Sequence, residues 1–135
     1  KSALNEKLNV ILCIGEKLID KKKNKTKYVL KKQLLEGLKN LNKLSKVIIA
    51  YEPVWSIGSG SLPEVSEIEE INLFIQNTVK DKLKNEDNFK ILYGGSVNSK
   101  NISNILKSQL IDGVLVGGAS LKSKEFIEIV NFNLN

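Results

Sequence analysis

The residues VIIAYEPVWSIGSG, at positions 47–60, indicate the fold more clearly than any other stretch of the chain. They begin with four apolar residues, a pattern typical of a strand that is buried on both faces of a parallel sheet. A carboxylate, Glu52, follows Tyr51 and comes directly before Pro53. Proline cannot continue a central strand, and it restrains the preceding residue to an extended conformation. We therefore expect Glu52 at the carboxyl end of a buried strand, with its backbone fixed.

The residues after Glu52 predict a mobile loop over that carboxylate. An acid at a strand end beneath a glycine-tipped loop is typical of a general base under a lid. Without the loop, Glu52 is more simply a surface carboxylate after a strand. Trp55 is more often a packing anchor than a ligand contact, and we expect it to seat the lid. The predicted lid comprises Pro53, Val54, Trp55, Ser56, Ile57, Gly58, Ser59 and Gly60.

Short apolar runs alternate with amphipathic helix patterns along the rest of the chain. The expected strands span residues 10–14, 47–51, 91–93 and 114–116. The expected helices cover residues 27–41, a segment with Pro63 in its first turn, a short segment near residues 102–106, and a last segment that carries Phe126, Ile127, Ile129 and Val130. Strands alternating with helices, without a linker or a change of composition, predict one parallel α/β domain over residues 1–135.

Two glycine pairs follow the last two expected strands. Gly94 and Gly95 precede Ser96, and Gly117 precedes Gly118. Glycine lets a backbone approach a ligand closely, and free N–H groups at the start of a helix suit an anion. Either pair alone is more simply a tight turn. Together, on adjacent strands, they match the phosphate site of barrels built from βα units.

Composition narrows the classes of function. The net charge is +6, and all cationic side chains are lysines, with neither arginine nor histidine. The absence of arginine, which binds phosphates and guanine edges best, argues against a nucleic-acid partner. No apolar run approaches the roughly 20 residues of a membrane span, and no signal peptide is visible.

The single cysteine, Cys13, precludes an internal disulfide and suits a reducing compartment. We expect it to be a small buried residue without a chemical role, because no histidine is present to activate it. The role of Glu16 stays open between a helix-start charge and a partner for the lid.

Four motifs in order resemble the second half of triosephosphate isomerases. Residues 13–18 (CIGEKL) resemble the end of the family's strand five, and residues 50–60 resemble strand six with its lid. Residues 93–97 (YGGSV) and 115–121 (LVGGASL) resemble strands seven and eight. The lid continues with Ser61, Leu62 and Pro63, where many members have a lysine and a longer approach to the proline. We expect this variant to be tolerated.

The resemblance implies a (β/α)8 TIM barrel, of which this chain supplies the last four βα units. It implies that Glu52 is the base that moves a proton between adjacent carbons of a triose phosphate, through an enediol. Gly58, Ser96, Gly117 and Gly118 would donate N–H groups to the substrate phosphate. It implies no metal and no organic cofactor, and a location in the cytoplasm, with a plastid left open.

The resemblance also implies that the family's electrophilic histidine and its cationic lysine lie upstream of this sequence. We therefore expect a half barrel with open edges at residues 10–14 and 114–116, which would pair with the N-terminal half or with a second copy as a homo-oligomer. The isolated chain should be nearly inactive. The alternative interpretation is a non-catalytic phosphate-binding or structural module that retains the half barrel.

Overall fold

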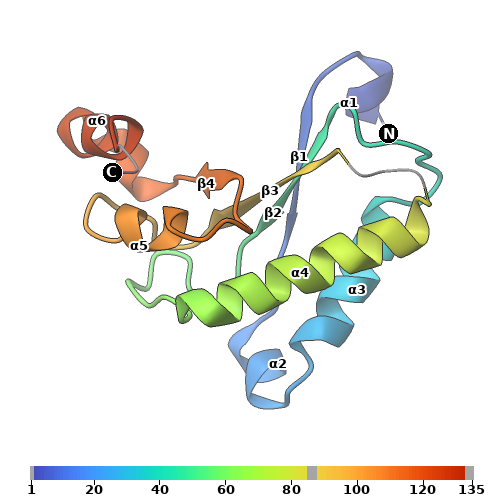
Figure 1. Ribbon diagram of the computed structural model, residues 1–135, viewed down its shortest axis with the longest axis horizontal. Coiled ribbons are helices and arrows are strands. Elements are labelled where there is room, and N and C mark those ends of the chain that lie inside the picture. The colour runs from blue at the N-terminus through green and yellow to red at the C-terminus, as the bar shows by residue number, and fades with distance from the viewer. Residues whose placement is uncertain (1, 85–87, 133–135) are drawn as a thin grey trace.

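Four short strands form one parallel sheet in the computed structural model, which describes residues 2–84 and 88–132 (Figure 1). They are β1 (Val10–Ile14), β2 (Val47–Tyr51), β3 (Lys90–Gly94) and β4 (Gly113–Leu115), adjacent in that order. All three pairings are parallel. The predicted parallel α/β class is therefore confirmed. The predicted β1 and β2 have the observed bounds, whereas β3 is one residue longer at each end and β4 begins and ends one residue earlier. The remaining residues of the expected domain, 1, 85–87 and 133–135, lie outside the described residues.

Helices follow the strands in alternation. They are α1 (Ser2–Asn5), α2 (Leu18–Lys22), α3 (Thr26–Gly37), α4 (Val65–Lys82), α5 (Ile102–Leu106), the 3-10 helix η1 (Gly118–Leu121) and α6 (Ser123–Val130). Two predicted bounds were wrong. The helix expected over residues 27–41 ends at Gly37, and Asn40 then adopts a left-handed φ of 62°. Pro63 lies before α4 rather than in its first turn, because Glu64 is the N-cap residue.

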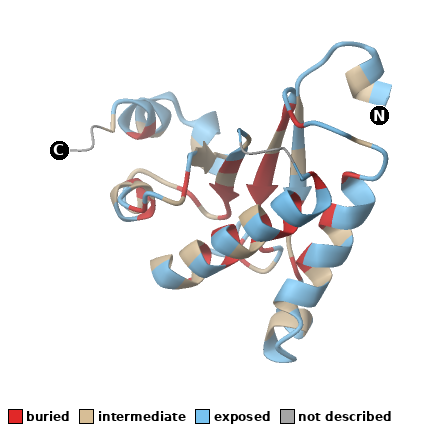
Figure 2. Cartoon of the chain, turned by 45° about the vertical axis from the view of Figure 1, so that its right-hand side comes forward, coloured by how far each residue is buried: buried red, intermediate tan, exposed pale blue. Residues whose placement is uncertain are grey.

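Helices α3 and α4 lie side by side along one face of the sheet (Figure 1). Their inward residues are buried, among them Leu30 and Leu34 of α3 and Ile68 and Ile75 of α4. In Figure 2 the buried segments of both helices face the strands, and their outer sides are exposed. Because side chains alternate along a strand, every second residue of each strand packs into this core. The apolar stripes predicted for these two helices thus build the core that positions the sheet.

No element among residues 2–84 and 88–132 covers the opposite face of the sheet. Ile11 and Cys13 point there and are exposed, so the expectation that Cys13 is buried was wrong. The predicted last helix is observed as α6, and most of its apolar residues are exposed. Ile129 alone of its four apolar residues is buried, and Ile127 and Val130 are 57% and 64% exposed.

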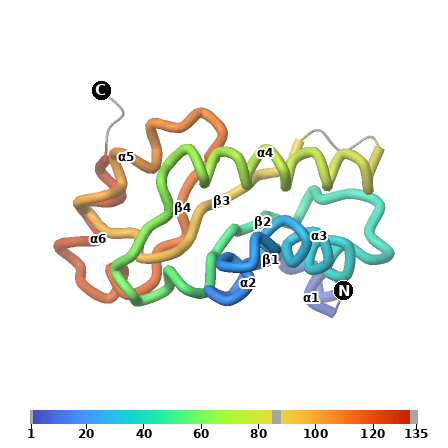
Figure 3. Tube along the Cα trace, turned by 90° about the horizontal axis from the view of Figure 1, so that it is seen from below, coloured from blue at the N-terminus to red at the C-terminus, as the bar shows by residue number. Residues whose placement is uncertain are grey.

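The two ends of the described chain lie at opposite sides of the molecule. Helices α5 and α6 gather beside β4, and α1 lies beside β1 (Figure 3). Strands β1 and β4 each have one partner within the described ranges, so both present an unpaired edge. A search of the described helices finds none with the length and hydropathy needed to cross a membrane.

Candidate active site

The carboxyl edge of the sheet forms a pocket of about 270 Å³ that brings together the predicted base and the predicted phosphate-binding residues. Glu52 lines it from the end of β2, and Gly58 from the lid. Ser96 lines it after β3, and Gly117 and Gly118 after β4. The strands are parallel, so their carboxyl ends meet at one edge, and segments far apart in sequence become neighbours. Of the lid, Ile57, Gly58 and Gly60 reach the pocket.

Glu52 is held by close contacts with glycines of both neighbouring strands. Its backbone N–H donates to the Ile14 carbonyl at 2.8 Å. A Cβ atom at Gly15 would meet the Glu52 carbonyl oxygen at 1.8 Å, and one at Gly94 would meet the Glu52 side chain at 2.5 Å. Both positions therefore need glycine. The sequence analysis missed this role, although each glycine directly follows or ends a strand in the sequence.

Cys13 is a neighbour of the Glu52 carboxylate on the uncovered face of the sheet. Partial desolvation of the thiol, its hydrogen bond to Glu52 and the charge of that carboxylate raise the pKa of Cys13 to about 11. The thiol therefore stays protonated at neutral pH and is a weak nucleophile. The prediction left Cys13 out of the chemistry, and the structure gives it a contact with the candidate base.

The two glycine turns form the wall of the pocket facing Glu52. Gly95 has a φ of +120° and Ser96 a φ of +48°, so the turn after β3 adopts a conformation that favours glycine at its first position. A Cβ at Gly95 would meet Ser56 Oγ at 2.9 Å. At Gly117 and Gly118 a Cβ would meet nothing within 4 Å, so the backbone there borders open space. This geometry leaves room for an anion beside exposed backbone.

The lid rests against the turn after β3. The Gly60 N–H donates to Ser96 Oγ at 3.0 Å, and Ser96 Oγ donates to the Ser56 carbonyl at 2.5 Å. Gly58 and Gly60 both have left-handed φ angles, +66° and +75°. These contacts seat the lid over the predicted phosphate site.

Glu16 lies beneath the lid and is fully buried. Its carboxylate accepts hydrogen bonds from Trp55 Nε1 at 2.8 Å and from the Tyr51 hydroxyl at 3.3 Å. Its carbonyl accepts one from the Val54 N–H at 3.0 Å. Of the two roles that the sequence left open for Glu16, the structure supports the partner of the lid.

Two charged residues of the pocket were missed by the sequence analysis. Lys122 and Glu125 line the pocket from the start of α6, with their charged atoms 3.8 Å apart. Among the described residues that line it, Lys122 is the one with a positive charge. Its position in the sequence, soon after the second glycine turn, is the feature from which its place in the pocket could have been predicted. The structure shows no cluster of three or more potential metal-ligating side chains within residues 2–84 and 88–132.

A parallel α/β sheet with a carboxylate and two glycine turns at its carboxyl edge defines the class of βα proteins whose ligand sites lie at that edge. Within that class, the family model for triosephosphate isomerase matches residues 1–133. The chain belongs to the triosephosphate isomerase family.

Similar proteins give the same assignment. The chain is 43% identical over 132 residues to a triosephosphate isomerase of Thermodesulfovibrio yellowstonii, covering 97% of this chain and 54% of that protein. It is 45% identical over 138 residues to one of Emericella nidulans, covering 99% and 55%. It is 47% identical over 131 residues to one of Dehalococcoides mccartyi, covering 96% and 51%. The chain spans about half the length of the curated relatives it matches.

Proposed function

We propose that this chain carries the base and the phosphate site of a triosephosphate isomerase, which interconverts glyceraldehyde 3-phosphate and dihydroxyacetone phosphate. The observation that carries the proposal is the shared pocket, in which Glu52 faces the backbone turns at Ser96 and at Gly117–Gly118 beneath a seated lid. A phosphate-binding module without catalysis needs neither the carboxylate nor the lid.

In the proposed reaction Glu52 removes a proton from the carbon beside the substrate carbonyl and returns it to the adjacent carbon. The N–H groups of Gly58, Ser96, Gly117 and Gly118 bind the phosphate and orient the reacting carbons toward the carboxylate. The closed lid excludes water, which strengthens the electrostatic interactions and protects the enediol from phosphate elimination. We assign no metal or organic cofactor to any step.

We also propose that catalysis requires four more βα units, supplied by an N-terminal barrel half or a second copy of this chain. The support is the unpaired edges of β1 and β4 and the uncovered sheet face, where Ile11 is 45% exposed. The electrophile and the lysine implied by the family resemblance would lie on an N-terminal half; a second copy of this chain could close the barrel but would not supply the electrophile, because the sequence has no histidine. The complete enzyme would be a homo-oligomer working in the cytoplasm or a plastid, which suits a chain with one free cysteine.

The test is an isomerase assay on glyceraldehyde 3-phosphate, with the chain alone and with an N-terminal barrel half taken from the Dehalococcoides mccartyi relative. We expect activity in the mixture and nearly none in the chain alone. Glu52→Gln should lower kcat of the mixture by about a hundredfold or more, as expected for loss of a positioned base. Glu128→Gln, which removes an exposed carboxylate of α6 outside the pocket, is the matched control and should leave kcat unchanged.

The alternative function is phosphate binding without turnover, favoured by the lack of histidine in the chain. A mixture that stays inactive, while inorganic phosphate still perturbs the 31P NMR signal in its presence, would support that alternative. Activity in the chain alone would show that some group within these 135 residues supplies the electrophile.

A further inference from the structure

Lys21, on α2, contacts two groups from different parts of the chain. Its Nζ lies 2.6 Å from Glu67 Oε1 on α4, and 2.9 Å from the other carboxylate oxygen of that residue. The same ammonium group lies 4.1 Å from the centroid of the Trp55 ring in the lid. Lys21 therefore connects α4 to the lid from outside the pocket, which it does not line.

The position of this ammonium group suits an attraction to the indole ring. A cation over the face of tryptophan is attracted by the negative charge of the ring face, more strongly where water is partly excluded. The side chains of Lys21 and Glu67 are 31% and 34% exposed, so water screens their pair less than it screens a fully exposed one. Glu67 thus fixes the ammonium above the ring.

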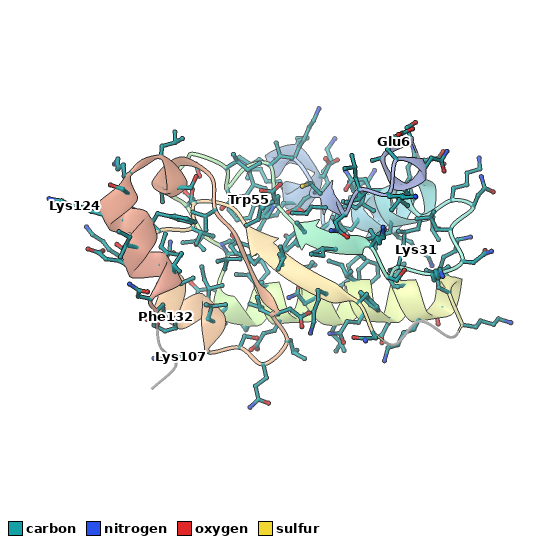
Figure 4. The ribbon with its side chains drawn as sticks, turned by 90° about the horizontal axis from the view of Figure 1, so that it is seen from above. Glu6, Lys31, Trp55, Lys107, Lys124 and Phe132 are labelled. Atoms are coloured by element: carbon teal, nitrogen blue, oxygen red, sulfur yellow. The ribbon has the colours of Figure 1, made fainter. Side chains whose placement is uncertain are left out.

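Trp55 is held from a second direction by Glu16. Its Nε1 donates to the buried Glu16 carboxylate, while Lys21 lies over the ring face. One contact fixes the edge of the ring and the other fixes its face. Figure 4 shows Trp55 in the interior of the molecule, with Lys124 at one end.

We propose that Lys21 and Glu67 form a clamp on Trp55 that stabilises the seated lid, with Lys21 as a positioning residue. The clamp rests on the proposed role of residues 53–60 as the lid of the isomerase site. In the seated lid Gly60 contacts Ser96 at the phosphate turn, so the clamp acts on substrate binding through Trp55.

The chain contains a matched control pair. Lys27 on α3 lies 2.6 Å from Glu70 on α4, and 5.9 Å from the centroid of the Phe74 ring. This pair has the same chemistry and also joins α4, but it does not touch the lid. A change that acts only by weakening helix contacts should have the same effect at either lysine.

Fluorescence of Trp55, the one tryptophan in the sequence, tests the clamp without an activity assay. In Lys21→Gln the ring loses its cation, and we expect acrylamide quenching to increase about twofold. Glu67→Gln should shift quenching in the same direction, and Lys21→Arg should restore it, because a guanidinium also stacks on aromatic rings. Lys27→Gln should leave quenching unchanged.

In the barrel assembled from the two halves, Lys21→Gln should lower kcat/KM about threefold to tenfold, mainly by raising KM, because the seated lid contributes to phosphate binding. Lys21→Arg should recover most of the loss, and Lys27→Gln should stay within about twofold of the unmodified chain.

Equal changes in quenching for Lys21→Gln and Lys27→Gln, or no change in the first, would overturn the clamp. If Lys21→Gln fails to fold by circular dichroism, the comparison of Glu67→Gln with Glu70→Gln decides the question in the same way. Loss of isomerase activity in every assembly would remove the proposed function, whereas the fluorescence comparison would still decide the clamp.

Discussion

At the scale of single residues, Glu52 fits between its neighbouring strands because the glycines beside it have no side chain. Gly15 leaves room for its backbone and Gly94 leaves room for its side chain. The Cys13 thiol makes a hydrogen bond with Glu52 and, with its raised pKa, carries no charge at neutral pH. A carboxylate that is to act as a base needs this fixed position, because its reach to a bound substrate tolerates little displacement.

The first prediction concerns the space at Gly94. In Gly94→Ala the new Cβ would lie 2.5 Å from Glu52 Cγ and Oε1, so the carboxylate has to move. We expect about a hundredfold loss of kcat in the assembled barrel, the cost of misplacing a reacting group by about 1 Å, and about 1–3 kcal/mol of lost stability from overpacking. Steady-state kinetics and urea unfolding measure both. Gly113→Ala, whose Cβ would meet only Leu92 Cδ2 at 3.2 Å, should retain kcat; an equal loss there would contradict the assignment.

The second prediction uses Cys13 as a probe of the Glu52 charge. With a pKa of about 11 the thiol is almost fully protonated at pH 8, so it should react slowly with iodoacetamide although it is exposed. Glu52→Gln removes the negative charge that helps to raise this pKa and replaces the charged acceptor of the thiol hydrogen bond with a neutral, weaker one. We therefore expect the alkylation rate at pH 8 to rise several-fold, by about tenfold for each unit by which the pKa falls. An unchanged rate would mean that the carboxylate does not face the thiol.

At the scale of elements, the sequence was enough to predict the strands and the core helices, but not the contacts that the loops make. Apolar runs that end just before glycine or proline marked both β1 and β2 well, although only β2 is largely buried. The end of α3 was missed because Leu38 and Leu41 continue the helical spacing, although they pack in the turn after the helix. Glu52, Ser96, Gly117 and Gly118 could be named from their place after strands, whereas Gly58 was named from the family resemblance. The contacts of Gly15 and Gly94 with Glu52 could not be predicted and the role of Glu16 stayed open, because these depend on contacts between strands and lid.

The third prediction concerns the two tyrosines at the ends of β2 and β3. Tyr51 and Tyr93 are buried with their rings edge to face, centroids 6.1 Å apart. Burial first, and then the charge of Glu16, raise the pKa of Tyr51. Burial likewise raises the pKa of Tyr93, although its hydrogen bond with Ser56 acts in the opposite direction.

Tyr51 and Tyr93 therefore ionise at lower pH in the unfolded chain than in the folded chain. Their ionisation leaves the free energy of unfolding unchanged below about pH 10 and lowers it as the pH rises above that value. We expect Tyr51 to contribute a loss of about 1.4 kcal/mol for each pH unit in that range, and Tyr93 to add a loss in the same direction. Urea unfolding between pH 9 and 12 measures the slope, to which Cys13 adds above pH 9. Tyr93→Phe should make the slope shallower. A slope that is the same in both chains would place Tyr93 in contact with water.

At the scale of the whole molecule, the chain exposes more surface than its mass requires. Its accessible surface is 8676 Å², whereas a compact monomer of 15.1 kDa exposes about 7,100 Å². The excess of about 1,600 Å² is about twice the roughly 800 Å² that each partner buries in a standard protein interface. It arises from the uncovered sheet face and from the apolar residues of α6, such as Ile127 and Val130.

The fourth prediction follows from this excess surface. Alone, the chain should sediment as dimers or larger species and bind the dye ANS, because unpaired strand edges and exposed apolar faces associate. Addition of the N-terminal barrel half should convert it to a complex containing one copy of each half and lower ANS fluorescence. Sedimentation velocity with and without the second half is the measurement. A stable monomer that does not bind ANS would contradict the half-barrel interpretation.

The order of the strands in space is their order in the chain, and this has a consequence for how the molecule folds. Each strand pairs with the one before it, so every βα unit can add to a surface that is already formed. No pairing has to wait for a segment that is synthesised much later, and each pairing closes a shorter loop than a pairing of β1 with β4 would. A nascent chain that has emerged as far as Gly94 already contains β1, β2, β3 and the helices between them, and therefore the whole seat of Glu52, before the phosphate turn after β4 has been synthesised.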